Sequence, residues 1–218
     1  MSQYHILDTT RNTTSRLAAL KAAGIQTIIR YYSRKYHWKV LKSPEAQAIS
    51  EVGLNIMVVY QDRQNQIGDF NRPAGYRAGV AAWEYARDVI GQPLGSAIYF
   101  AVDFNPNSHQ VEACIHPYFK GVQDAFRSLS EGGNSYQIGV YGSGLVINTL
   151  KNEGMVEFRW LSQSYGFRGT RSAMENKAYE IRQICYEPRV RCETELAGIA
   201  IDYDEKRDPS TKIGAFQV

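Results

Sequence analysis

The chain has 218 residues and a mass of 24.7 kDa, with 44% hydrophobic and 22% charged side chains, as in an ordinary globular protein. The formal net charge of +3 gives no indication of nucleic-acid binding, although a mildly basic surface tolerates an acidic polymer. No apolar run reaches the ~18 residues of a membrane span, and the N-terminus has no basic region followed by an apolar stretch. We therefore expect no membrane insertion, and synthesis in the cytoplasm without a signal peptide.

The cysteines and histidines do not predict a metal site. Cys114, Cys185 and Cys192 have no CxxC or Cys/His spacing, and the four histidines are scattered. Cys185 and Cys192 could meet across a hairpin, but the odd number argues against a disulfide framework and favours three free thiols. We expect neither a metal nor a cofactor.

Apolar runs alternate with helical patterns along most of the chain. Helices are expected over 13–23, 43–52, 73–90, 111–129 and 145–152, where apolar residues recur at helical spacing. Pro117 is expected to interrupt the fourth of these. Short runs rich in β-branched and aromatic residues predict eight strands: 4–7, 26–32, 55–60, 96–105, 136–141, 158–163, 178–185 and 198–201.

This alternation is typical of βα units and a parallel sheet. Eight strands without a change in composition favour one domain, residues 1–218, folded as a single closed (β/α)8 TIM-like barrel. Residues 164–177 and 186–197 lack a clean apolar period, so the last helices are expected to be short or irregular. A doubly wound open sheet is the alternative.

Three of the predicted strands end in a carboxylate: Asp8, Asp103 and Asp202. In α/β barrels the C-terminal strand ends form the catalytic face, so these acids are expected to converge there. Strand alternation places Tyr99 and Ala101 on the same face as Asp103. Clustered acids whose pKa values differ are suited to glycoside hydrolysis, with one proton donor and one ionised carboxylate. The alternative is that Asp8 and Asp202 only cap loops or pair with Arg30.

Other polar or aromatic residues in and after the strands are expected to contact substrate at the same mouth. Amide and tyrosine groups suit sugar hydroxyls and acetamido groups, whereas Arg30 is equally consistent with a structural ion pair with Asp8. Gly142 and Gly144 follow a strand, but the third glycine of a dinucleotide fingerprint is replaced by Ile147. The expected substrate-binding residues are Arg30, Tyr32, Tyr60, Gln61, Tyr99, Tyr141, Gln163 and Gln183.

Taken in order, several segments resemble a bacterial glycoside hydrolase-like domain of unknown function, which is similar to the family 25 lysozymes. These segments are ALKAAG, IIRYY, SPEAQAISEVGL, IYFAVDFN, YFKGV, IGVYGSG, RWLSQS and GIAIDYD. The resemblance implies a barrel muramidase in which Asp8 matches the first acid and Asp202 the last. It also implies that Asp103 matches the glutamate of the D-x-E pair, as acid/base, whereas Ala101 occupies the place of the pair's first acid.

The sequence thus predicts a lysozyme-like glycoside hydrolase that cleaves an aminosugar polymer, peptidoglycan, with Asp103 as general acid and Asp8 or Asp202 as second carboxylate. The alternative is a catalytically silent barrel that binds carbohydrate of the cell wall, as Ala101 suggests. A wall-acting protein without a signal peptide would reach the periplasm or wall by non-classical export or lysis. A secretion-apparatus or inhibitor partner and a monomeric state are further expectations.

Overall fold

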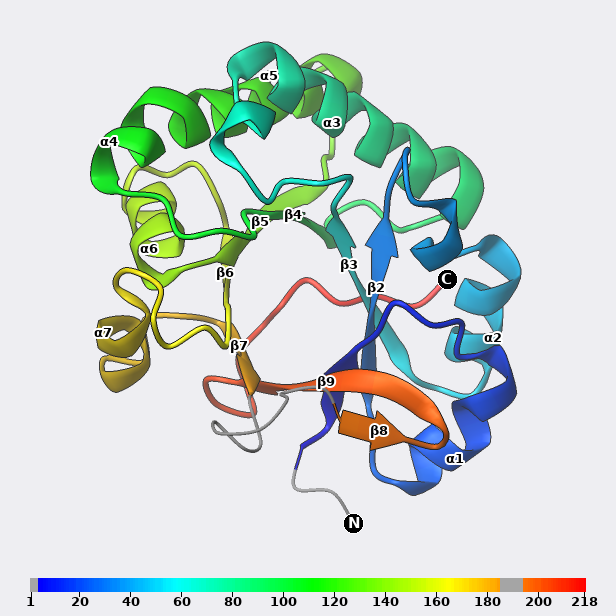
Figure 1. The fold of residues 1–218 in the computed structure, drawn as a ribbon. Coiled ribbons are helices and arrows are strands. Elements are labelled where there is room, and N and C mark those ends of the chain that lie inside the picture. The colour runs from blue at the N-terminus through cyan, green and yellow to red at the C-terminus, as the bar shows by residue number, and fades with distance from the viewer. Residues whose placement is uncertain (1–3, 185–193) are drawn as a thin grey trace.

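A computed structural model describes residues 4–184 and 194–218 of the chain. Its strands form one closed barrel with the helices outside it (Figure 1). Seven strands pair in chain order and in parallel, and an eighth closes the ring. The barrel strands are β1 (Ile6–Asp8), β2 (Thr27–Tyr32), β3 (Asn55–Tyr60), β4 (Ala97–Ala101), β5 (Gln137–Gly142), β6 (Phe158–Leu161), β7 (Ile181–Ile184) and β9 (Ile199–Lys206). The predicted TIM-like α/β barrel is confirmed.

The closing strand differs from the expected parallel one. β9 lies between β7 and β1 and is antiparallel to both. It follows the short strand β8 (Thr194–Leu196) through a tight turn in which Ala197 and Gly198 both have positive φ. This hairpin turn reverses the chain without a helix, so β9 enters the barrel wall from the mouth and runs down to Lys206.

Seven α-helices occur in the described residues, and α7 lies in a stretch expected to be irregular. They are α1 (Leu17–Ala22), α2 (Ser43–Glu51), α3 (Arg72–Glu84), α4 (Ser108–Gln110), α5 (His116–Ser130), α6 (Gly144–Asn152) and α7 (Thr170–Glu175). The π-helical segments Tyr85–Ile90 and Val111–Ile115 extend α3 and precede α5, and Pro117 lies in the first turn of α5. The 3₁₀ turns are Thr14–Arg16, His37–Lys39 and Ile67–Asp69.

Helices α3 and α5 pack side by side on the outside of the barrel at very short range (Figure 1). A Cβ atom on Gly75 would lie 1.8 Å from the carbonyl oxygen of Tyr118, and one on Gly121 would lie 2.1 Å from that of Arg72. Glycine is therefore required at both positions by the approach of the two backbones.

The C-terminal segment closes the bottom of the barrel, opposite the mouth. It runs across the barrel in Figure 1, with Ile213 buried among the inward-facing side chains of the strands. Gly214 accepts a hydrogen bond from the backbone of Ala97, and Phe216 pairs with Ile56. The C-terminal segment thus fills the barrel interior from below.

None of the helices in the described residues is long and apolar enough to cross a membrane. Cys114 is half-buried and free. Cys185 and Cys192, the pair considered for a hairpin disulfide, lie outside the described residues.

Candidate active site

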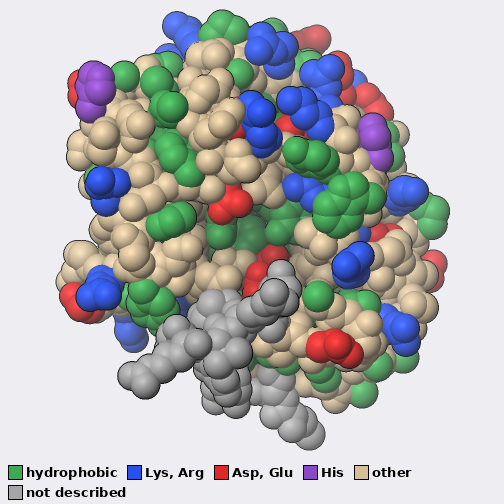
Figure 2. Space-filling view, in the orientation of Figure 1, with side chains coloured by type: hydrophobic (Ala, Val, Ile, Leu, Met, Phe, Trp, Pro, Cys, Tyr) green, Lys and Arg blue, Asp and Glu red, His purple; other side chains and the backbone are tan. Residues whose placement is uncertain are grey.

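A cavity of about 240 Å³ opens at the C-terminal ends of the parallel strands. Figure 2, which looks onto this end of the barrel, shows a hollow near the centre with acidic side chains beside it. Seven barrel strands or the residues directly after them contribute to its wall. The lining residues are Tyr31, Val59, Gln61, Ala101, Asp103, Tyr141, Trp160, Gln163, Ser164, Gln183 and Asp202.

One side of the cavity holds a group of linked carboxylates. Asp8 and Asp202 are directly opposite each other in the β1–β9 ladder. The amide nitrogen of Gln183 donates to both, at 2.8 Å to Asp8 Oδ2 and 3.2 Å to Asp202 Oδ2. The Tyr31 hydroxyl donates to Asp8 Oδ1 at 3.1 Å. Asp202 faces the cavity, whereas Asp8 is buried behind Gln183 and Tyr31.

A third carboxylate, Asp204, lies below this pair, because inward-facing residues of β9 recur at every second position. It is fully buried and accepts a hydrogen bond of 2.7 Å from the indole nitrogen of Trp160. Burial, with repulsion from Asp202 second, raises the pKa of Asp8 to about 7. Burial and the charge of Asp8 also raise the pKa of Asp204. Asp8 and Asp204 therefore hold protons far more strongly than ordinary aspartates.

Asp103 lies after β4 and lines the cavity from another part of its wall. Gln61 donates to Asp103 Oδ2 at 3.2 Å, and Lys39 Nζ donates to Gln61 Oε1 at 2.9 Å, which fixes the amide orientation. Desolvation raises the pKa of Asp103, against the opposing effects of Gln61 and Lys39. Desolvation also lowers the pKa of Lys39 to about 8. The carboxyl group thus holds a proton more strongly than an ordinary aspartate, whereas Gln61 and Lys39 stabilise its ionised form.

The remaining polar wall provides hydrogen-bonding groups for a ligand. Tyr141 donates to Gln183 Oε1 at 3.0 Å, which orients the amide that holds the acids. Gln163 Oε1 is buried in the wall and has no hydrogen-bond partner within the described residues. A hydroxyl or acetamido N–H group of a bound sugar would satisfy this acceptor.

Three residues expected at the mouth lie elsewhere. Tyr32 and Tyr60 face outward from the barrel, where their hydroxyls donate to Gln92 and Asp62 at 2.8 Å. The predicted position of both at the mouth is wrong, because a strand buried on both sides shows no polar alternation from which its inward face can be identified. Tyr99 does face inward, but deep in the barrel, where it donates to the Ile213 carbonyl at 3.0 Å.

Arg30 also faces outward and is structural. Its guanidinium pairs with Glu45 of α2 at 2.9 Å, and both side chains are only 1% exposed. Glu45 in turn accepts from the Thr13 backbone at 2.8 Å, so this ion pair ties β2 to the loop after β1. Arg30 therefore neither contacts the mouth cavity nor pairs with Asp8, the two alternatives considered, but pairs with Glu45.

Of the predicted residues, the structure brings Asp103, Asp202, Gln61, Tyr141, Gln163 and Gln183 to the cavity wall and Asp8 directly behind it. Sequence reasoning missed Tyr31, Lys39, Trp160 and Asp204. Asp204 could have been predicted from the sequence, since it lies two residues after Asp202 and therefore on the same face of the strand. Lys39 could not be predicted in this way, because it lies in the 3₁₀ turn His37–Lys39, outside the predicted helices and strands. The described residues include no group of three His, Cys, Asp or Glu side chains arranged to hold a metal ion.

The chain belongs to the family described as the Rv2525c-like, glycoside hydrolase-like domain, which matches residues 18–195. The predicted resemblance is thereby confirmed. The match includes Asp103 but not Asp8 or Asp202, which lie on the two strands that close the barrel. Two proteins of Bacillus subtilis are similar: YbfG, 30% identical over 166 residues, and FadG, 28% identical over 164 residues. The alignments include 72% and 73% of this chain, but only 22% and 28% of YbfG and FadG.

Solved structures share the fold. The Tat-secreted protein Rv2525c of Mycobacterium tuberculosis, in complex with L-tartrate, superimposes with a TM-score of 0.77 at 23% identity, over 98% of this chain and 99% of that one. A muramidase from Acremonium alcalophilum gives 0.53 at 12% identity, over 94% of each chain. The Streptococcus pneumoniae autolysin LytC with a synthetic peptidoglycan ligand gives 0.52 at 11% identity, over 91% of this chain and 45% of that one.

Proposed function

We propose that this barrel is a glycosidase that cleaves the glycan of peptidoglycan at the mouth cavity. The observation that carries the proposal is that Asp103 and Asp202 line one cavity from different strands, and that burial favours the protonated form of Asp103. Glycoside hydrolysis requires such a pair, one carboxyl group to protonate the leaving oxygen and another in its ionised form. The muramidase and autolysin among the structural neighbours support the choice of substrate.

Asp103 is the proposed general acid. Desolvation favours its protonated form, and the Lys39–Gln61 chain holds its position and stabilises the carboxylate left after proton transfer. Asp202 is the proposed ionised carboxylate. Gln183 orients it, and the raised pKa values of Asp8 and Asp204 behind it favour their protonated forms at acidic pH, which limits the repulsion around it.

The test compares purified wild-type protein with Asp103→Asn and Asp202→Asn on insoluble peptidoglycan, with new reducing ends as the measurement. Each variant should reduce the rate by about 100-fold or more, as expected for loss of an acid or base. Asp88→Asn, an exposed acid outside the cavity, is the matched control and should retain full activity. Release of reducing ends at the wild-type rate by both cavity variants would contradict the proposal.

A second candidate function, a silent carbohydrate-binding barrel, is favoured by Ala101. This small side chain lines the cavity two residues before Asp103, at the place where the resemblance to the family 25 lysozymes implies the first acid of the D-x-E pair. A silent barrel would release no reducing ends, yet would sediment with peptidoglycan in both wild-type and Asp103→Asn forms. Gln163→Ala, which removes the unpartnered acceptor, should weaken that sedimentation, and Ala101→Asp should confer measurable hydrolysis. Hydrolysis by the wild-type protein excludes this candidate.

A further inference from the structure

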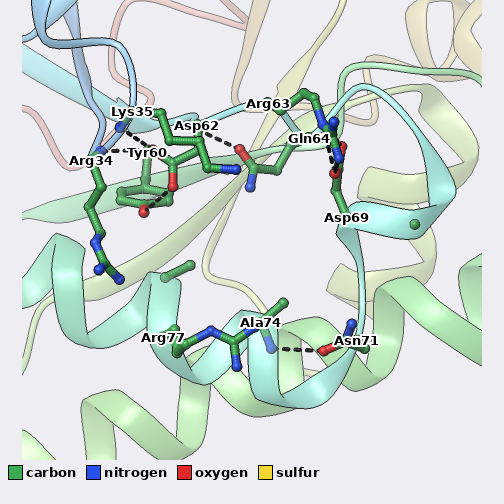
Figure 3. Close-up of a pocket in the computed structure, with 12 residues that line it drawn as sticks. Arg34, Lys35, Tyr60, Asp62, Arg63, Gln64, Asp69, Asn71, Ala74 and Arg77 are labelled. Carbon is green, nitrogen blue, oxygen red and sulfur yellow. Dashed lines mark hydrogen bonds and ion pairs between the residues drawn. The ribbon is translucent and has the colours of Figure 1, made fainter.

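A second, larger cavity of about 490 Å³ lies outside the barrel beside its mouth. Figure 3 shows that it is enclosed by the loops after β2 and β3 and by the start of α3. Six of its lining residues carry charge, four basic and two acidic: Arg34, Lys35, Arg63, Arg77, Asp62 and Asp69. We refer to this cavity as the basic pocket.

Both acids of the basic pocket are occupied by partners within the protein. Asp62 accepts hydrogen bonds from the Ser33 and Tyr60 hydroxyls, each at 2.8 Å. It also accepts from the backbone nitrogen of Arg34 at 2.7 Å, and these hydrogen bonds lower its pKa in spite of its burial. Asp69 is paired with Arg63, whose Nε lies 2.8 Å from Oδ1 (Figure 3).

The cations of the pocket are not neutralised in the same way. Arg34, Lys35 and Arg77 are exposed and form no ion pair within the described residues. Figure 3 shows Arg34 and Arg77 on different walls of the pocket, one from the β2 loop and the other from α3. The start of α3 adds the positive end of its helix dipole. The pocket therefore favours an anionic group between the two arginines.

The basic pocket and the mouth cavity share one wall. Gln61 lines the mouth, whereas its neighbours Asp62 and Gln64 line the basic pocket. The backbone of Asp103 donates to the Gln64 carbonyl at 2.8 Å, so the proposed general acid is anchored to this wall. The two cavities therefore lie on either side of the segment that follows β3.

We propose that the basic pocket binds the carboxylates of a peptide that branches from the glycan, an inference that rests on the proposed function. The guanidinium groups of Arg34 and Arg77 lie on two walls of the pocket (Figure 3), and a guanidinium group can donate two parallel hydrogen bonds to one carboxylate. The amides of Gln64 and Asn71, which also line the pocket, suit peptide groups. The pocket would thus select the peptide-bearing sugar for cleavage.

The test measures calorimetric binding of a muropeptide disaccharide whose peptide carries free carboxylates, and of the same compound with those groups amidated. The wild-type protein should bind the free acid about 10-fold more tightly, as expected for charge-assisted hydrogen bonds. Arg34→Gln/Arg77→Gln should abolish this preference and leave binding of the amidated compound unchanged. Arg171→Gln/Lys212→Gln, which removes the same charge from exposed residues outside the pocket, should retain the preference.

Equal affinity of the wild-type protein for both compounds, or a preference that survives Arg34→Gln/Arg77→Gln, would overturn the inference. Inorganic phosphate that competes better than the free peptide would also overturn it, in favour of a phosphate site. Binding of the free peptide, which has no sugar to occupy the mouth cavity, measures the affinity of the basic pocket alone. Its binding to wild-type protein but not to the pocket variant supports the site even where the glycan is neither bound nor cleaved, so the two proposals fail separately.

Discussion

The burial of Asp8 makes the stability of the protein depend on pH. The pKa of its carboxyl group is about 7 in the folded protein, above the ordinary value of 3.8. The folded state therefore binds more protons than the unfolded state between these values, so this group stabilises the fold at low pH. Its contribution is complete below about pH 4 and is lost as the pH rises through 7.

Replacing Asp8 by asparagine should remove much of this dependence. The free energy of unfolding of wild-type protein should fall by roughly 1 to 4 kcal/mol, relative to Asp8→Asn, between pH 4 and 7. Urea denaturation at a series of pH values measures the difference. Glu175→Gln, an exposed helical acid, is the control and should follow wild type. Parallel curves for wild type and Asp8→Asn would show that Asp8 titrates normally in the fold.

At the residue scale the sequence predicts the acids of the site better than their neighbours. A carboxylate at the end of an apolar strand is visible in the sequence, and Asp8, Asp103 and Asp202 all lie at the mouth. Assigning faces within 27–32 required knowing that a buried arginine would point away from the barrel. Arg30 does so because Glu45 of α2 meets it there, a contact between elements that no local pattern reveals.

At the scale of elements, the glycines between α3 and α5 set how closely these helices approach. Alanine in place of a helical glycine ordinarily stabilises a helix by about 1 kcal/mol. In Gly121→Ala the new methyl group would overlap the Arg72 carbonyl, so we expect a loss of roughly 2 to 4 kcal/mol instead. Thermal unfolding measures this loss. Gly166→Ala, with open space around the new methyl group, should change stability little; comparable losses in both variants would refute the close-packing explanation.

The helices and parallel strands were largely predictable from local sequence. Apolar residues recur at the spacing of a helix or form short strand-like runs, and glycine residues mark where several helices end. The strand 55–60 is observed with the predicted bounds. The direction of β9 was not predictable from its four apolar residues, since the Ala197–Gly198 turn and the continuation to Lys206 determine it. Helix α7 was missed because only two of its six residues, Thr170 and Ala173, are buried, too few to produce an apolar period.

At the scale of the whole molecule, the C-terminal segment is part of the barrel core. Gly214 has a positive φ, and a Cβ atom there would lie 2.3 Å from that of Ala97. Gly214→Ala should therefore destabilise the protein by about 1 to 3 kcal/mol more than Gly91→Ala, which carries the same backbone strain with no atom nearby. Chemical denaturation of the two variants tests this. Equal stabilities would mean that the segment does not close the barrel tightly.

Barrel closure also has a consequence for the order of folding. Asp8 and Asp202 face each other only when β1, almost the first segment of the chain, pairs with β9, nearly the last. Pairing at such long sequence separation carries a high loop-closure entropy, so it is disfavoured until the intervening strands have assembled. A nascent or partly folded chain therefore contains Asp103 without its partners. If the proposed function holds, hydrolytic competence is acquired in the same step that completes the ring, and unfinished molecules are inactive.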